Sequence, residues 1–379
     1  MKSCRVIQLV QRLYPFEISR VQLLSINLEN FRNIKFSELT FSSSRVFFIG
    51  LNAQGKTNLL EAIGLSSNLR SFRKSGMDGL VMEDSKFSRL FYNFHYDNKD
   101  NIEVFFTFEN KGNKTLEVDG EKIRRFADYL GKFPVVCMSS RDFRLVRDGP
   151  SERRKWLDMV LSLSSQNYFK VLQSFHRSLR ERNSLLKKNG SDREIDAFEK
   201  ILVSSAIELI KLRKQAFPKL SDSFKKYCDL LTGKKEDASL MYLPDSSLED
   251  GEEEYRNFFV KSREKDRQFG STRRGPHRDD FELCINGRNA KTFASEGQQK
   301  GLVLGLRFAE FDFLRNELKV VPIILADDIL GELDPERRKN FNNLIPSDVQ
   351  FFGTGTEFPF LDNLEEWQIL KVKKGNFSL

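Results

Sequence analysis

Cysteine and histidine are scarce in this chain of 379 residues. The cysteines are Cys4, Cys137, Cys228 and Cys284, and no two stand in the Cys-x-x-Cys spacing of a zinc site. The three histidines are equally scattered. Cysteines so far apart also give no disulfide framework, which fits a reducing cytosol. The composition therefore argues against a zinc module and against a disulfide-stabilised secreted domain.

Long apolar runs are missing as well. No segment approaches the ~20 consecutive apolar residues that a membrane-spanning helix needs. Residues 1–20 carry basic side chains but lack the apolar core and cleavage site of a signal peptide. We therefore expect a cytoplasmic protein without a membrane segment, in which residues 1–20 form an N-terminal extension.

The surplus of basic over acidic residues is small, with 62 Lys and Arg against 54 Asp and Glu, a net charge of +8. A positive balance favours an acidic partner such as nucleic acid, but a solvated basic surface explains it equally well. Hydrophobic residues make up 39% of the chain and include 35 phenylalanines. This is enough for one or two globular domains with aromatic cores.

Residues 50–57 read Gly-Leu-Asn-Ala-Gln-Gly-Lys-Thr and match the phosphate-loop pattern at every fixed position. An apolar strand precedes them and a helical segment follows, as the motif requires. Gly50 and Gly55 let backbone amides curl around a phosphate, and the helix N-terminus adds partial positive charge. We expect Lys56 to reach the β- and γ-phosphates of a nucleotide and Thr57 to bind Mg²⁺.

A second candidate element is the apolar strand 320–326, which runs directly into Asp327 and Asp328. In phosphate-loop NTPases an Asp at such a strand end holds Mg²⁺ through water, and a neighbouring carboxylate activates the attacking water. Asp327 suits the first role and Asp328 the second. Taken alone, the pair also fits a solvated acidic turn.

The rest of the chain predicts several further elements. Short strands are expected at 21–31, 87–96, 101–110, 114–120 and 134–139. Apolar residues recur at helical spacing from Trp156 to Leu179 and again from Ile195 to Leu212, and Pro218 is expected to end the second helix. The two helices together predict an αα-hairpin. Residues 234–254 are expected to form a surface loop around one short strand. The C-terminal part predicts helices at 297–318 and 335–343 and strands at 320–326, 349–353 and 367–373.

Several motifs resemble, in their order along the chain, those of the RecF family, which are bacterial recombination-repair ATPases of the ABC type related to SMC heads. The matching segments are 30–33, 52–63, 70–73, 149–154, 182–187, 275–280, 295–300 and 326–334. The resemblance implies an α/β, ABC-type P-loop ATPase head, a mixed sheet with flanking helices plus an antiparallel β part, with an inserted helical second lobe. The implied division is 21–150 and 270–379 for the ATPase lobe and 151–269 for the helical insert.

The resemblance also implies roles that spacing alone does not assign. Ser295 and Gly297 look like the ABC signature turn, which would cap the γ-phosphate held by a partner subunit and so take part in catalysis. Asp334 looks like the D-loop residue. Arg32 resembles an arginine that approaches the nucleotide phosphates, and Asn52 belongs to the nucleotide-binding loop.

From the same resemblance we expect ATP and Mg²⁺ as cofactors and an ATP-dependent homodimer that clamps DNA, both double-stranded DNA and gap junctions between single- and double-stranded DNA. RecR and RecO are the implied protein partners, and support of recombinase loading is the implied role. ATP hydrolysis is expected to be slow, because Asp328 is shorter than the glutamate usual in ABC proteins. The candidate phosphate contacts on DNA are the basic residues within 70–74 together with Arg177, Arg180, Arg182, Lys187 and Lys188, although each of them alone fits a solvated helix face better.

The chain departs from the ABC pattern in the switch region, where no histidine occurs and only Thr354 or Thr356 is available to bond the γ-phosphate. No Q-loop glutamine is identified. The segment 275–280, Gly-Pro-His-Arg-Asp-Asp, fits either a charged turn that packs the lobes or a DNA or partner contact.

The alternatives to a RecF-type ATPase are the ATPase subunit of another ABC-type machine such as a transporter, a metabolic P-loop kinase, and a DNA clamp that holds ATP without turnover.

Overall fold

The computed structural model describes residues 18–379 apart from 74–75, 98–99, 111, 246–250 and 361–363. Most of the expected N-terminal extension therefore lies outside the described residues, while its last two residues already belong to strand β1 (Ser19–Phe31). Among the described helices, none has the length and apolar content needed to cross a membrane.

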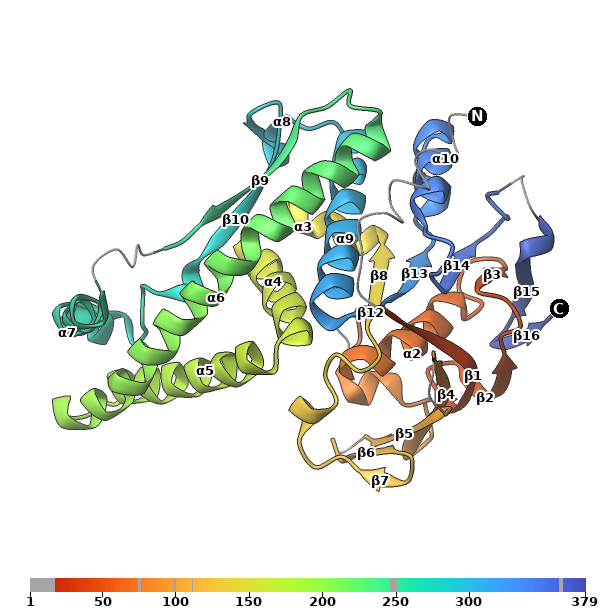
Figure 1. The fold of residues 1–379 in the computed structure, drawn as a ribbon. Coiled ribbons are helices and arrows are strands. Elements are labelled where there is room, and N and C mark those ends of the chain that lie inside the picture. Colours follow the sequence, from red (N-terminus) through yellow and green to blue (C-terminus); the bar gives the residue numbers. More distant parts are fainter. Residues whose placement is uncertain (1–17, 74–75, 98–99, 111, 246–250, 361–363) are drawn as a thin grey trace.

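The central sheet is built from both ends of the chain (Figure 1). Its order is β16 (Asn376–Ser378), β15 (Trp367–Lys373), β3 (Arg45–Ile49), β14 (Phe351–Gly355), β13 (Ile323–Asp327) and β8 (Val135–Ser139). All neighbours pair in parallel except β16 with β15. Because β3 lies between two C-terminal strands, the phosphate loop that follows it meets the C-terminal motifs at one sheet edge.

An antiparallel sheet lies beside the central one and covers helix α2 (Lys56–Asn68). Its antiparallel strands are β1, β2 (Ile34–Thr40), β4 (Phe87–Tyr96), β5 (Ile102–Glu109), β6 (Lys114–Val118) and β7 (Glu121–Lys122), and β12 (Val320–Val321) joins β1 in parallel. Alternate residues of β4 and β5 are buried, among them Tyr92, Phe94, Phe106 and Phe108. This alternation is what a sheet with one face on the core requires.

The strand expected at 320–326 is two strands in two different sheets. β12 pairs with β1, whereas β13 pairs with β8 and β14. Pro322 separates them, and because proline has no N–H to donate to a ladder, the chain changes sheets there.

A helical arm extends from the central sheet (Figure 1). It contains α4 (Pro150–Ser164), α5 (Gln166–Lys187), α6 (Asp192–Thr232) and α7 (Gly251–Phe269), with a small sheet of β9 (Ala238–Leu243), β10 (Asp280–Ile285) and β11 (Arg288–Asn289). Helix α9 (Glu296–Leu318) packs on α6, α4 and β8, and so joins the arm to the central sheet.

The arm corrects three expectations. The first helical run is two helices, since Ser165 is extended and caps α5. The second does not stop at Pro218 but forms one helix of 41 residues, because Phe217 and Leu220 on either side of the proline are buried in the core. Helix α7 was missed, since its first residues fall in the acidic segment 234–254 that was expected to be a loop.

Candidate functional site

The phosphate loop leaves β3 and enters α2 through a tight turn. Gly50 donates its N–H to the carbonyl of Gly355 at 3.2 Å, which ties the loop to β14. Gly55 caps α2 with φ 111°, a backbone conformation open to glycine and costly for other residues. Residues 50–57 therefore present backbone amides at a helix N-terminus, the geometry that binds a phosphate.

Lys56 folds back over this loop. Its ammonium donates to the carbonyls of Gly50 at 2.6 Å and Leu51 at 3.1 Å, and lies 4.0 Å from the Asp328 carboxylate. Its side chain is only 3% exposed. A buried ammonium held by loop carbonyls keeps the positive charge where a bound phosphate needs it.

Thr57 and Asp327, 270 positions apart, are in direct contact. The Thr57 hydroxyl donates to Asp327 Oδ1 at 2.8 Å. Burial raises the pKa of Asp327 to about 6, the nearby Asp328 charge adds to the rise, and the Thr57 hydrogen bond opposes it. The hydroxyl and carboxylate oxygens are the hard ligands that Mg²⁺ prefers, so the residues present fit the cation expected here.

Asp328 follows in a left-handed conformation with φ 52°. Its side chain is 43% exposed and lies beside Lys56, so the carboxylate opens toward the phosphate loop. Asn52 is an exposed residue of that loop. The structure thus brings together the residues predicted from the phosphate loop and from the strand 320–326.

Arg32 reaches the same region from the end of β1. Its guanidinium forms two hydrogen bonds to Glu61 of α2, at 2.9 and 2.7 Å. Glu61 is fully buried and also binds Arg73 at 3.5 Å and the Ser71 hydroxyl. Sequence reasoning missed Glu61, because a glutamate inside an amphipathic helix gives no signal of its arginine partners.

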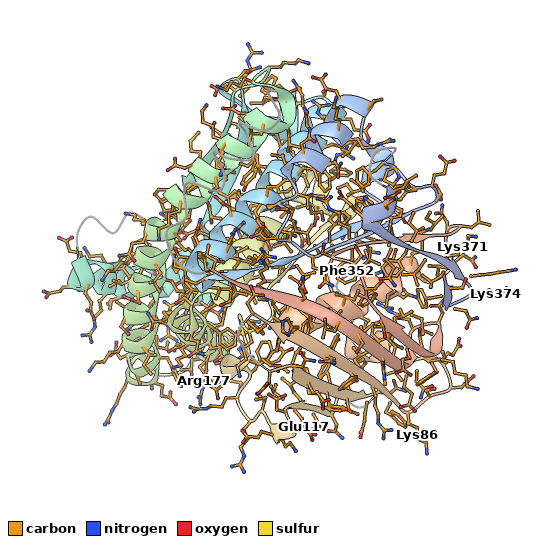
Figure 2. The ribbon with its side chains drawn as sticks, turned by 45° about the vertical axis from the view of Figure 1, so that its right-hand side comes forward. Lys86, Glu117, Arg177, Phe352, Lys371 and Lys374 are labelled. Carbon is orange, nitrogen blue, oxygen red and sulfur yellow. The ribbon has the colours of Figure 1, made fainter. Side chains whose placement is uncertain are left out.

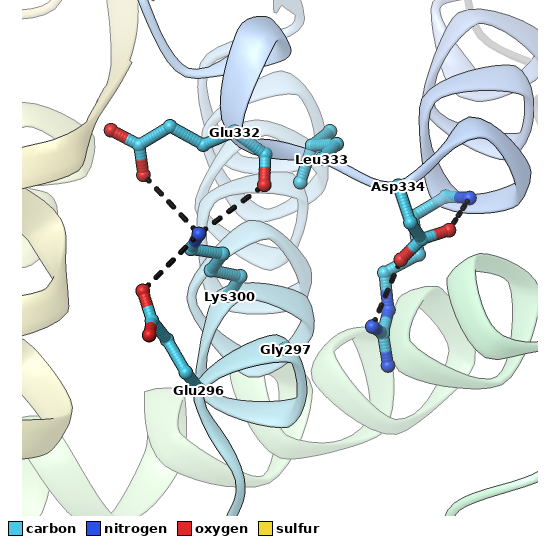
Figure 3. Close-up of a pocket in the computed structure, with 7 residues that line it drawn as sticks. Glu296, Gly297, Lys300, Glu332, Leu333 and Asp334 are labelled. Carbon is cyan, nitrogen blue, oxygen red and sulfur yellow. Dashed lines mark hydrogen bonds and ion pairs between the residues drawn. The ribbon is translucent and has the colours of Figure 1, made fainter.

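The predicted signature turn forms the start of α9. The Ser295 hydroxyl accepts from the N–H of Gln298 at 3.3 Å, and the Gln298 side chain accepts from the N–H of Ser295 at 2.8 Å. This reciprocal capping box fixes the turn. Ser295 is exposed, and Gly297 lines a cavity of about 280 Å³ together with Glu296, Lys300, Glu332, Leu333, Asp334 and Arg337 (Figure 3).

Asp334 caps α10 (Pro335–Leu344) by accepting the Arg337 N–H at 2.9 Å, and this hydrogen bond lowers the pKa of Asp334. Lys300 links α9 to the same segment through the Glu332 carbonyl at 3.3 Å. Among the described residues that line this cavity, none belongs to the phosphate loop. The predicted site residues therefore form two groups, a phosphate-loop group and a signature group.

The candidate DNA contacts on α5 divide by exposure. Arg177, Arg180, Lys187 and Lys188 are exposed, and Figure 2 shows Arg177 at the lower edge of the arm, on the side toward Glu117. Arg182 is fully buried and bonds Glu199 at 2.9 Å and Asp266 at 2.8 Å. Its expected phosphate contact is wrong, since a charge held by two buried carboxylates is not available to a ligand.

The segment 275–280 packs parts of the arm together. Asp279 is buried and accepts from Arg213 of α6 at 2.8 Å. Asp280 binds Arg153 of α4 through two hydrogen bonds, at 2.8 and 2.9 Å. His277 bonds the Thr272 carbonyl through Nε2 at 3.0 Å, and burial lowers the pKa of His277 to about 4. These contacts give the segment a packing role within the arm, and a DNA or partner contact there stays a prediction.

The central parallel sheet, the antiparallel sheet beside α2 and the helical insert define an ABC/SMC-type head. The family model described as RecF/RecN/SMC N terminal domain matches residues 22–376. The chain is 34% identical to the DNA replication and repair protein RecF of Leptospira biflexa over 91% of this chain and 93% of that protein. It is also 34% identical to RecF of a Synechococcus species, over 93% and 96%. The protein belongs to the RecF family.

Solved structures agree with this assignment. A structure of the recombination mediator protein RecF with ATP, in the RecFOR pathway, superimposes with a TM-score of 0.88 at 32% identity, covering 96% of this chain and 99% of that one. An Smc head domain from Pyrococcus furiosus has a TM-score of 0.56 at 16% identity, covering 93% and 94%. The second likeness concerns the fold alone. The expected fold class and family are confirmed.

Proposed function

We propose that this protein is a RecF-type, ATP-dependent DNA-binding protein and a slow ATPase that acts in recombinational repair and replication restart. The observation that carries the proposal is the 2.8 Å contact of Thr57 with Asp327, beside Lys56. It assembles the two halves of a Mg²⁺–ATP site from distant parts of the chain. The similarity to the RecF–ATP structure over nearly the whole chain supports the same function.

In this proposal the two groups of site residues work in different subunits. Residues 50–57 bind the ATP phosphates, Asp327 and Thr57 hold Mg²⁺, and Asp328 orients the attacking water. Ser295 and Gly297 contact the γ-phosphate held by the partner subunit, which explains why the signature group lies apart from the phosphate loop. ATP then favours the dimer only as far as it binds the dimer more tightly than the monomer.

The dimer clamps DNA, double-stranded or at gap junctions, and hydrolysis releases it. The exposed basic residues of α5 supply phosphate contacts, whose contribution weakens with salt. RecR and RecO are the proposed partners, and recombinase loading is the proposed outcome. An ABC ATPase of another kind, such as a transporter subunit, would show no DNA-dependent turnover.

Sedimentation velocity with ATP and DNA tests the arrangement. Wild type is expected to dimerise only with ATP, whereas Ser295→Arg binds ATP and stays monomeric, because the added side chain fills the position of the partner's phosphate. Ser295→Ala separates the effect of bulk from that of the lost hydroxyl, since it loses the same helix cap, worth about 1 kcal/mol, and the same phosphate contact without adding a side chain that fills the position. A wild type that stays monomeric with ATP and DNA present overturns the proposal.

A further inference from the structure

Thr354 lies at the carboxyl end of β14, next to the end of β13. It is 1% exposed, although the neighbouring Thr356 is exposed. Parallel pairing of β14 with β13 sets Gly353 opposite Ala326, so the residues that follow on the two strands lie side by side. Thr354 is therefore a buried hydroxyl next to the two site carboxylates.

The Thr354 hydroxyl both donates and accepts a hydrogen bond. It donates to Asp327 Oδ1 at 3.1 Å and accepts the backbone N–H of Asp328 at 2.9 Å. A hydroxyl carries a single proton, so the one given to Asp327 is not available for a phosphate oxygen. In this structure the Thr354 proton is therefore directed to Asp327, and the expectation that Thr354 or Thr356 bonds the γ-phosphate stays a prediction.

The two bonds restrain two different properties of the site. Thr57 and Thr354 both approach Asp327 Oδ1, so they fix the rotation of that carboxylate. Asp328 is left-handed, a conformation that is unfavourable in most residues other than glycine. The bond from its N–H to Thr354 opposes this cost and holds the Asp328 carboxylate toward Lys56.

We propose that Thr354 is a positioning residue that sets the orientation of both Asp327 and Asp328. The inference rests on the proposed function, in which Thr57 binds Mg²⁺. When the Thr57 oxygen serves the cation, Thr354 becomes the hydroxyl that still orients Asp327. In a chain whose switch region has no histidine, Thr354 connects β14 to the carboxylates instead of to the nucleotide.

Substitution by valine removes the hydroxyl at nearly constant shape, and serine restores it. In nucleotide-free protein, hydrogen exchange of the Asp328 amide is expected to speed up about fivefold to tenfold in Thr354→Val, the loss of one hydrogen bond, and to stay at the wild-type rate in Thr354→Ser. Thr107→Val on β5 is the matched control and leaves the Asp328 amide unchanged.

With nucleotide, Thr354→Val is expected to raise the Mg²⁺ concentration needed for ATP binding and to lower kcat about tenfold, with ATP affinity at saturating Mg²⁺ within twofold of wild type. Thr354→Ser recovers both quantities. The inference is overturned if Thr354→Val keeps the wild-type amide exchange and Mg²⁺ dependence. It is also overturned if the valine and serine variants are equally defective. Wild type that binds Mg²⁺–ATP without turnover contradicts only the ATPase part of the proposed function, because exchange and Mg²⁺ dependence still report on Thr354.

Discussion

At the scale of single residues, buried charges organise the site more than exposed ones do. Glu61 is fully buried and neutralises Arg32 and Arg73, which approach from β1 and from the segment after α2. Removing one partner of a buried ion pair leaves the other charge unpaired and poorly solvated. Glu61 therefore holds two guanidinium groups next to the phosphate loop.

Replacement of Glu61 by glutamine tests this role at nearly constant volume. Glu61→Gln is expected to lower the free energy of unfolding by about 3 kcal/mol, measured by urea denaturation. Glu29→Gln is the control, because its pair with Arg89 is exposed and worth less than about 0.5 kcal/mol. Equal losses in the two variants would show that the arginines do not depend on Glu61.

Single residues also show where sequence reasoning ends. Lys56, Thr57 and Asp327 were identified because each stands in a motif whose flanking strand and helix are visible in the sequence. Arg182 was misjudged, because the partners that decide its role are distant in sequence. Arg182 follows basic neighbours on α5, yet helical rotation turns it inward to Glu199.

At the scale of elements, the C-terminal hairpin supports the phosphate loop. The turn between β15 and β16 donates the Lys374 N–H to the Gln54 side chain at 2.9 Å and the Gly375 N–H to the Gln54 carbonyl at 2.8 Å. Gly375 has φ 77°, and a Cβ there would lie 2.8 Å from the Asn33 carbonyl. Any side chain at Gly375 therefore displaces the turn from the loop.

Gly375→Ala is expected to weaken ATP binding about tenfold, because even a small displacement misaligns groups that must converge on one ligand. Gly287→Ala is the matched control, since this Asn-Gly turn has φ 72° and a Cβ there would meet nothing within 4 Å. Both variants carry the strain of a left-handed alanine, whereas only Gly375→Ala should change ATP affinity in calorimetry. Equal ATP affinities in the two variants would show that the turn between β15 and β16 does not support the phosphate loop.

Element boundaries followed the sequence wherever local signals agreed. Asp119-Gly120 and Asn286-Gly287 are sequences typical of tight hairpin turns, and all four residues have positive φ as such turns require. Pro218 was wrongly taken as an end, because core packing on both sides outweighs the lost hydrogen bond. The split at Pro322 depends on which sheet each half joins, and a local pattern does not contain that information.

At the scale of the whole molecule, stability should depend on pH through His277. Its pKa is about 4 in the folded protein, against an ordinary value near 6.5. Between these values the unfolded chain binds the additional proton, so His277 stabilises the fold above pH 6.5 and this contribution is lost as pH falls toward 4. Because His277 is packed within the arm, the arm should become less stable in mild acid.

His277→Gln removes this dependence. From pH 7.5 to pH 5, wild type is expected to lose about 1–2 kcal/mol more unfolding free energy than the variant, measured by urea titration at each pH. His95→Gln on β4, where His95 bonds Asn101 at an exposed position, is the control and should follow wild type. A His277→Gln variant that loses stability in parallel with wild type would contradict the assignment.

The division into an ATPase lobe at 21–150 and 270–379 and a helical lobe at 151–269 stays a prediction. One observation bears on its second boundary, because β10 at 280–285 pairs with β9 of the arm. A boundary after β11 would keep that small sheet in one unit. The assignment of the head itself depends on the central sheet, which residues from both ends of the chain complete.

The position of β3 between β14 and β15 has a consequence for synthesis. A ribosome that adds about 5–20 residues per second needs roughly 15–60 s to make the ~300 residues between the end of β3 and the start of β14. Throughout that interval the apolar strand before the phosphate loop has neither of its partners. The nascent chain must be kept from aggregating for that time, and a ribosome that stalls before residue 351 leaves β3 with both edges open.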